Sequence, residues 1–83
     1  SLFLDSQGLP GVAYYDAANA DLRFAKMNGL ATWDVSVVDA RGSVGQYPSL
    51  QFDSADRPLI SYYDETNGDL KLACLKSRVW RTS

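Results

Sequence analysis

The sequence contains no histidine and a single cysteine, Cys74. One cysteine cannot form a disulfide within the chain, and without histidine or a second cysteine a zinc site would need an unusual set of carboxylates. Histidine is the usual base near neutral pH, so neither a Ser–His nor a Cys–His catalytic pair can be built. These absences favour a non-catalytic protein with no cofactor and no metal.

The chain also lacks long apolar runs and clustered basic residues. No stretch approaches the roughly 20 apolar residues that cross a bilayer, and the start SLFLDS has neither the basic region nor the apolar core of a signal peptide. The formal net charge is −2, and the lysines and arginines are scattered, so no surface for a phosphate backbone is apparent. We therefore expect no membrane partner and no nucleic acid partner.

The chain is short. At 83 residues it is near the size at which a single hydrophobic core barely outweighs the conformational entropy of the chain. Small chains are commonly stabilised by disulfides, by a structural metal or by association. Because the first two are disfavoured here, association is the expected source of stability.

The main feature that is present is an internal repeat. The segment LPGVAYYDAANADLRFA is followed later by PLISYYDETNGDLKLA. With an offset of 48 residues, residues 1–25 and 49–73 share 12 identical positions. Near the end of the unit the offset is one residue shorter, since Trp33 best matches Trp80. A period of this length indicates a repeat architecture.

Each unit is predicted to contain short β-strands. Runs rich in β-branched and aromatic residues suit a pleated sheet, and they are separated by turn-rich segments such as SQGLP and SADRP. No window carries the apolar spacing of an amphipathic helix. We expect strands at residues 1–5, 12–15, 22–27 and 33–39 in the first unit, at residues 49–53, 60–63 and 70–75 in the second, and the start of a further strand at residues 79–83.

Both faces of the predicted sheets are apolar. In the third strand of the first unit, Leu22 and Phe24 point to one face, while Ala25 and Met27 point to the other. A sheet with two apolar faces must be covered on both sides. Four short antiparallel strands in a unit of about 40–50 residues, covered in front and behind, are typical of a β-propeller blade.

We therefore predict an all-β, β-propeller-type fold with two four-stranded antiparallel blades. Residues 1–48 form the first blade with a linker, and residues 49–83 form the second blade, which lacks most of its outer strand. Because propellers use about four to eight blades, two blades cannot close a ring. We expect head-to-tail contacts that complete the ring, either in a homo-oligomer, with a trimer favoured, or with further blades of a longer parent chain.

The pattern SLxxDS…PxIxYYDxxNGDLKxA resembles the repeat of bacterial β-propeller proteins, and the resemblance covers essentially the whole chain. It implies a repeat architecture and an extracellular or periplasmic location, and it brings no catalytic residue with it. The segment NGLATW at residues 28–33 is faintly similar to the Asp-box of sialidase-type propellers, although it lacks the aspartate of that box.

The loops after the second and fourth strands are expected at the same end of the sheets. They contain repeated acidic and amide side chains and the segment ARGSVGQYP at residues 40–48. For the Asp-x-x-Asn-x-Asp turns, hydrogen bonds to their own backbone are favoured over calcium coordination. The candidate ligand-binding residues at this end are Tyr15, Asp16, Asn19, Asp21, Arg41, Gln46, Tyr47, Tyr63, Asp64, Asn67 and Asp69.

These residues favour a non-catalytic binding scaffold that is lectin-like, because a tyrosine ring beside aspartate and asparagine acceptors suits a carbohydrate or another polar ligand. One alternative is a set of purely structural blades in a larger protein. Another is a glycosidase-like or sialidase-like propeller, whose carboxylate pair would be Asp16 and Asp64.

Overall fold

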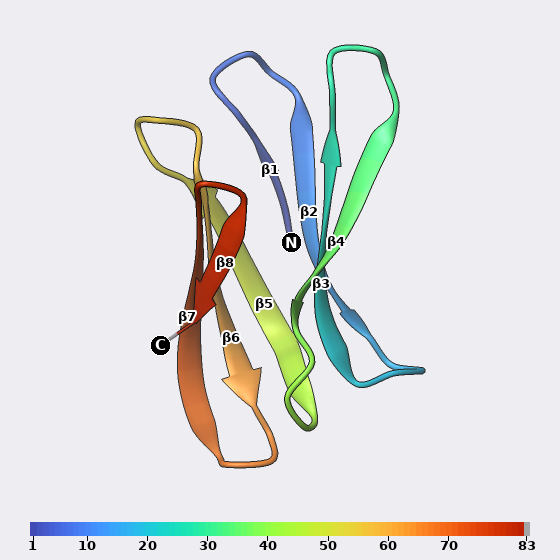
Figure 1. Cartoon of the computed structure of the whole chain (residues 1–83), viewed down its shortest axis with the longest axis vertical. Helices are drawn as coiled ribbons and strands as arrows, with labels where there is room; N and C mark the ends of the chain where they lie inside the picture. Colours follow the sequence, from blue (N-terminus) through green and yellow to red (C-terminus); the bar gives the residue numbers. More distant parts are fainter. Residues whose placement is uncertain (83) are drawn as a thin grey trace.

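The computed structural model describes residues 1–82 of the chain, and these residues form eight β-strands and no helix (Figure 1). This part of the chain thus holds no helix with the length and apolar character needed to span a membrane. The strands are β1 (Leu2–Leu4), β2 (Pro10–Asp16), β3 (Asp21–Met27), β4 (Trp33–Asp39), β5 (Val44–Phe52), β6 (Pro58–Asp64), β7 (Asp69–Lys76) and β8 (Val79–Thr82).

The strands form two four-stranded antiparallel sheets, a first sheet ordered β1-β2-β3-β4 and a second sheet ordered β5-β6-β7-β8. Each strand pairs with the next one along the chain, and the two sheets lie side by side in Figure 1. The prediction of an all-β chain with two such sheets is confirmed. Within residues 1–82 the sheets close into neither a barrel nor a propeller.

The central strands of the two sheets follow the repeat. Both β2 and β6 begin at a proline, which a strand tolerates at its first residue, and both end at an aspartate that starts the next turn. Their pairing with the third strand has the same register in both sheets. Tyr14 lies opposite Arg23 in the first sheet, and Tyr62 lies opposite Lys71 in the second.

The first strand of the second sheet is longer than predicted. Strand β5 begins at Val44 and not at residue 49, so the loop predicted at residues 40–48 is confined to its first part. The pairing of β5 with β6 shifts register between Val44 and Gln46 and again between Gln46 and Ser49. Gly45 and Tyr47 have positive φ angles of 105° and 54°, so the chain absorbs extra residues as bulges and continues the strand.

The outer strand of the second sheet lies at the predicted place, residues 79–83, and is shorter than its counterpart in the first sheet. It is less truncated than expected, because β8 spans four residues and β4 spans seven. The strand forms because Val79 and Trp80 pair with the end of β7, after a tight turn in which Ser77 and Arg78 have positive φ angles.

The two sheets pack front to back. We call the face of the first sheet that carries Ala13, Leu22 and Phe24 its front face, and the face of the second sheet that carries Ile60 and Tyr62 its back face. All five side chains are buried where these faces meet. These side chains belong to the hydrophobic core, which therefore lies largely at this contact. Burying a leucine or phenylalanine side chain contributes about 1.5–3 kcal/mol to stability.

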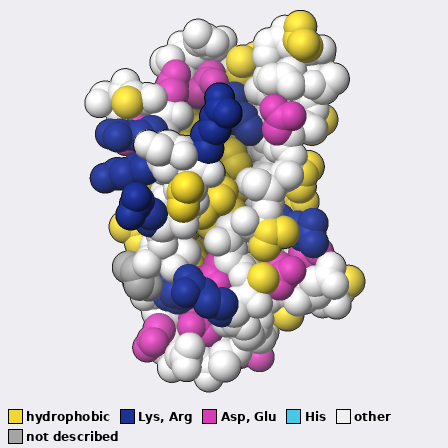
Figure 2. All heavy atoms as spheres, in the orientation of Figure 1, with side chains coloured by type: hydrophobic (Ala, Val, Ile, Leu, Met, Phe, Trp, Pro, Cys, Tyr) yellow, Lys and Arg dark blue, Asp and Glu magenta, His cyan; other side chains and the backbone are white. Residues whose placement is uncertain are grey.

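Aromatic side chains interlock across this contact. The Phe24 ring lies with its centroid 6.4 Å from the Phe52 ring and 5.5 Å from the Trp80 ring, edge to face in both cases. Gly11 makes room for them, because a Cβ atom at this position would lie 2.8 Å from Phe52 Cζ. Hydrophobic side chains accordingly gather along the middle of the view in Figure 2.

Residues 1–82 leave large apolar side chains exposed on the other face of each sheet. On the front face of the second sheet, Leu70 and Leu72 are exposed, although the equivalent Leu22 and Phe24 of the first sheet are buried. The back face of the first sheet exposes Leu2, Leu4, Trp33, Val35 and Val37. The expectation that both faces are apolar is therefore met, and within the described residues only one face of each sheet is packed against the other sheet.

Candidate functional site

The loops that carry the predicted ligand residues lie at one end of the molecule, the lower end in Figure 1. The segment between β4 and β5 contacts both neighbouring turns. The Val44 amide donates a hydrogen bond to the Ala20 carbonyl (3.1 Å), and the Glu65 amide donates one to the Ser43 carbonyl (3.0 Å). The Ser43 amide in turn donates to the Thr66 hydroxyl (2.7 Å). These contacts join three loops into one surface.

The two aspartate turns are held by their own side chains. Asp16 Oδ1 accepts the Ala18 amide (3.1 Å), and its Oδ2 accepts the Asn19 side-chain amide (2.9 Å). Asp64 repeats the arrangement with Asn67, whose side-chain amide lies 2.8 Å from Asp64 Oδ2. The hydrogen bond from Asn19 is the main cause that lowers the pKa of Asp16 below its ordinary value.

This geometry is that of aspartate side chains that stabilise turns. Residues 1–82 contain no group of three or more histidine, cysteine, aspartate or glutamate side chains that could hold a metal ion. The turn interpretation of the repeated aspartates therefore accounts for Asp16 and Asp64 without a ligand. Asp21 is the strand partner of Asp16, and Asp69 is the strand partner of Asp64, at the pair of residues next to each turn.

One group of predicted residues does form an exposed aromatic surface. Tyr47 is 83 % exposed, and its ring centroid lies 6.5 Å from that of Tyr63. Gln46 is the strand partner of Tyr63, and Leu70 pairs with Tyr63 on its other side. Beside them lies an open, polar hollow of about 460 Å³, which is lined by Asp64, Asn67, Asp69, Leu70 and Lys71.

Other predicted residues lie apart from this surface. Asp16 and Asn19 belong to the turn of the first sheet, where Asp16 Oδ2 also lies 2.9 Å from Arg23 Nε. Tyr15 is half-buried in β2. Arg41 donates a hydrogen bond to the Thr82 hydroxyl and therefore ties the loop to β8. The predicted set thus divides into an exposed tyrosine surface on the second sheet and structural groups elsewhere.

A buried polar cluster between the sheets was not predicted. The Asp39 carboxylate, at the end of β4, is fully buried and accepts a hydrogen bond from the Tyr62 hydroxyl (2.7 Å). The same oxygen lies 2.8 Å from Lys71 Nζ. Both donors come from the back face of the second sheet, so this cluster fixes how the second sheet lies on the first.

The cluster shifts the proton affinities of its members. Burial by itself raises the pKa of Asp39, but the hydrogen bonds from Lys71 and Tyr62 outweigh burial, and the pKa lies below the ordinary value. Burial and the hydrogen bond to Asp39 raise the pKa of Tyr62. Asp39 is therefore a carboxylate and Tyr62 a neutral phenol near neutral pH.

One sequence signal could have indicated this cluster. A tyrosine and a basic residue lie opposite each other in both units, as Tyr14 with Arg23 and as Tyr62 with Lys71. Their carboxylate partner, Asp39, lies at the end of the first unit, beyond the stretch in which the two units match residue by residue.

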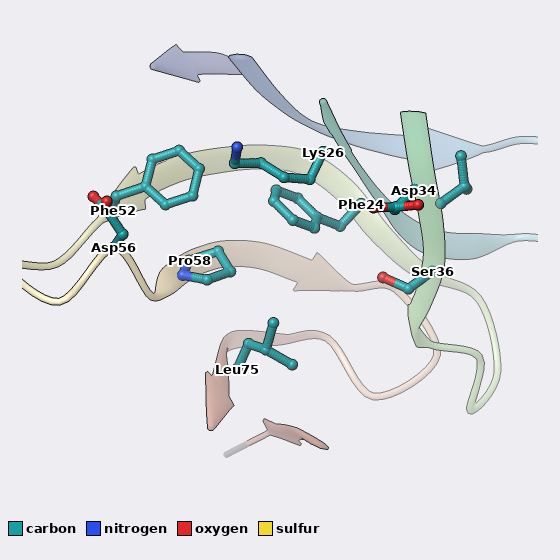
Figure 3. Close-up of a pocket in the computed structure, with 9 residues that line it drawn as sticks. Phe24, Lys26, Asp34, Ser36, Phe52, Asp56, Pro58 and Leu75 are labelled. Atoms are coloured by element: carbon teal, nitrogen blue, oxygen red, sulfur yellow. The ribbon is translucent and has the colours of Figure 1, made fainter. Parts of the chain in front are cut away.

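An apolar cleft of about 250 Å³ lies between the two sheets near the opposite end (Figure 3). Phe24, Phe52, Pro58 and Leu75 form its walls. Three charged groups lie at its rim. Lys26 Nζ lies 2.8 Å from Asp5 Oδ2, Asp56 accepts hydrogen bonds from Ser6, and Asp34 accepts a hydrogen bond from the Asn28 side chain (3.4 Å). The cleft therefore offers mainly apolar contact.

Comparison with known proteins adds no family to this geometry. No protein-family model, no curated protein and no solved structure matches the chain. The functional interpretation accordingly depends on the packing of the two sheets and on the groups that their open faces present.

Proposed function

We propose that the chain is a pair of propeller-type blades that acts as a non-catalytic binding scaffold and is completed head to tail by further sheets of the same kind. One observation supports this proposal above the others. Leu22 and Phe24 are 0 % and 4 % exposed, whereas Leu70 and Leu72, at the equivalent positions of the second sheet, are 81 % and 48 % exposed. The front face is therefore covered in the first sheet and exposed in the second sheet.

The contact between the two sheets inside the chain indicates which kind of surface would pack on the open front face. Within the chain, the covering back face presents Leu50, Ile60 and Ala73, which lie opposite one another on three neighbouring strands. The first sheet places Leu2, Val12 and Ala25 in the same register on its own back face. A second copy therefore carries a back face of matching chemistry for Leu70 and Leu72.

Because the two faces differ, the contact between copies is heterologous, and it ends only when a ring closes. Three copies give six sheets, which lies within the usual range of about four to eight blades. A large exposed apolar face is costly in water, and ring closure removes it from every copy.

The proposal is tested by sedimentation velocity on the wild-type chain and on two variants. The wild type is expected at a multiple of the chain mass, with the trimer favoured. Leu70→Glu places a charge on the open front face and should give a monomer. Leu30→Glu changes an equally exposed leucine in the loop before β4 and should leave the assembly intact. A wild-type monomer at high micromolar concentration contradicts the proposal.

A carbohydrate ligand is the second candidate function, and the contact between the exposed Tyr47 and the half-buried Tyr63 supports it. Stacking on a tyrosine ring, combined with hydrogen bonds to the nearby Asn67 and Asp69 side chains, is a chemistry that suits a sugar. Binding on a glycan array should be lost in a Tyr47→Ala, Tyr63→Ala double variant. Binding that survives this change would place the ligand elsewhere, and an array without any binding would remove the candidate.

A further inference from the structure

Three donors of the second sheet contact strand β4 across the covered interface. The Trp80 indole donates to the Ser36 hydroxyl (3.3 Å), and the Tyr62 hydroxyl and the Lys71 ammonium group donate to the Asp39 carboxylate at 2.7 and 2.8 Å. Ser36 and Asp39 are three residues apart on one strand. The second sheet therefore binds a strand that carries a hydroxyl group followed, three residues later, by a carboxylate.

The same three donors are repeated on the open back face of the first sheet. Trp33, Tyr14 and Arg23 occupy the positions of Trp80, Tyr62 and Lys71. Tyr14 lies opposite Arg23, as Tyr62 lies opposite Lys71. Trp33 lies opposite Met27, as Trp80 lies opposite the equivalent leucine of the second sheet. The register of the donors is thus the same on the covered and on the open face.

These donors have unused capacity. Among residues 1–82, the Tyr14 hydroxyl has no hydrogen-bond partner, and Trp33 is exposed. Arg23 lies with its Nε 2.9 Å from Asp16 Oδ2, but no other described side chain pairs with the two terminal nitrogens of its guanidinium group. An arginine side chain has five N–H donors in a planar fork, so it can keep Asp16 and bind a second carboxylate.

We propose that this back face is the docking site for the outer strand of a partner sheet, and that the partner strand carries a hydroxyl group and, three residues later, a carboxylate that binds Tyr14 and Arg23. The inference rests on the proposed head-to-tail scaffold and adds the chemistry of the partner. It is supported by complementary charge and by the internal contact, in which equivalent donors bind Asp39.

The partner strand that this face requires is one like β4, which presents Ser36 and Asp39 to the second sheet. A partner sheet with such an outer strand covers the apolar side chains of the back face. It also supplies a carboxylate to Tyr14 and a second carboxylate to Arg23, beside Asp16.

The test uses the capped peptide WDVSVVDARG, which is residues 33–42, and the same peptide with Asp39→Asn. The protein is the full chain with Leu70→Glu, because this change prevents association of copies through the opposite face and leaves the back face of the first sheet open. Binding is followed by NMR at the Arg23 Nε–H and the Trp33 indole N–H.

The wild-type peptide should shift both signals saturably, and the Asp39→Asn peptide should bind about tenfold more weakly, since it loses a charge-assisted hydrogen bond. Arg23→Gln should weaken binding by a similar factor. Arg23→Lys should keep most of the affinity, because the second sheet uses Lys71 at this position. The matched control is Lys76→Gln, which removes one exposed positive charge from the other sheet and should change nothing.

Three results overturn the inference. They are equal affinity of the two peptides, no shift of Arg23 at millimolar peptide, and shifts at Tyr62 and Lys71 instead, which would mean that the peptide displaces β4 inside the chain. The scaffold proposal is tested separately, by the mass of the wild-type chain in solution. If the wild type is a trimer and the peptide does not bind, only the proposed chemistry of the partner strand is contradicted. If the wild type is a monomer and the peptide binds, only the proposed self-assembly is contradicted.

Discussion

At the scale of single residues, the buried carboxylate of Asp39 has the largest effect on how the two sheets are arranged. Its Oδ2 atom accepts hydrogen bonds from two side chains of the opposite sheet, Tyr62 and Lys71. A buried ion pair is poor support for stability as such, but loss of one member leaves the others buried without a partner. The cluster therefore favours one specific arrangement of two faces that are otherwise apolar.

Replacement of Asp39 by alanine should lower the free energy of unfolding by about 3 kcal/mol, because Lys71 and Tyr62 then lose their acceptor. Urea denaturation followed by tryptophan fluorescence measures the change. Asp34→Ala on the exposed part of the same strand is the control and should remain near the wild type. Equal effects of the two changes would contradict this role of Asp39.

The cluster also predicts a dependence of stability on pH. The pKa of Asp39 in the folded chain lies below its ordinary value of 3.8. Its contribution is therefore present above the unfolded pKa and is lost as the pH falls through the folded pKa, so the free energy of unfolding should decline below about pH 5. Asp39→Asn should flatten this decline but not abolish it, since Asp5, Asp16 and Asp53 also have lowered pKa values.

At the scale of strands and loops, the sequence predicted most of the structure. The strand at Trp33–Asp39 was predicted with its observed bounds, and the four central strands agree within two residues at each end. Alternating apolar residues and the repeat were sufficient there. The bulged start of β5 could not be predicted, because glycine and proline at Gly45 and Pro48 are also typical of a loop, and only pairing with β6 distinguishes the two.

The candidate site was less predictable than the strands. The turn aspartates were correctly interpreted from local chemistry alone, since each bonds within its own turn. The cluster of Asp39, Tyr62 and Lys71 depends on how one sheet lies on the other, which no local pattern specifies. The pairing of Tyr47 with Tyr63 depends on the positive φ of Tyr47 inside the bulge, and the residue type does not indicate that conformation.

Gly45 should be required for the bulge that starts β5. Its φ is 105°, and a Cβ atom there would lie 2.6 Å from the Leu22 Cα, so an alanine meets both backbone strain and a clash with β3. We expect Gly45→Ala to destabilise the fold by at least about 1–3 kcal/mol, which is the usual cost of such strain alone. Gly29→Ala is the control, because nothing lies within 4 Å of its Cβ position. Thermal unfolding compares the two, and a stable Gly45→Ala variant would contradict the assignment of the bulge.

At the scale of the whole molecule, the two sheets are successive members of a series. The front of the first meets the back of the second, which leaves one back face and one front face open. These two open faces have the chemistry of the two faces that already fit each other inside the chain. The polar groups fix the order in which sheets can pack. The donors lie on the back face of the second sheet, and the acceptors Ser36 and Asp39 lie on the outer strand of the first sheet.

The most direct test of this account is an isotope-filtered NOE measurement on an equal mixture of ¹³C-labelled and unlabelled wild-type chains. Inside one chain, Phe24 contacts Trp80. At the proposed contact between copies, the equivalent residues would be Leu72 of one copy and Trp33 of the other. The account predicts intermolecular NOEs between the Leu72 methyl groups and the Trp33 ring. NOEs that join Leu72 only to Leu72 of another copy, or no intermolecular NOE at millimolar concentration, would contradict it.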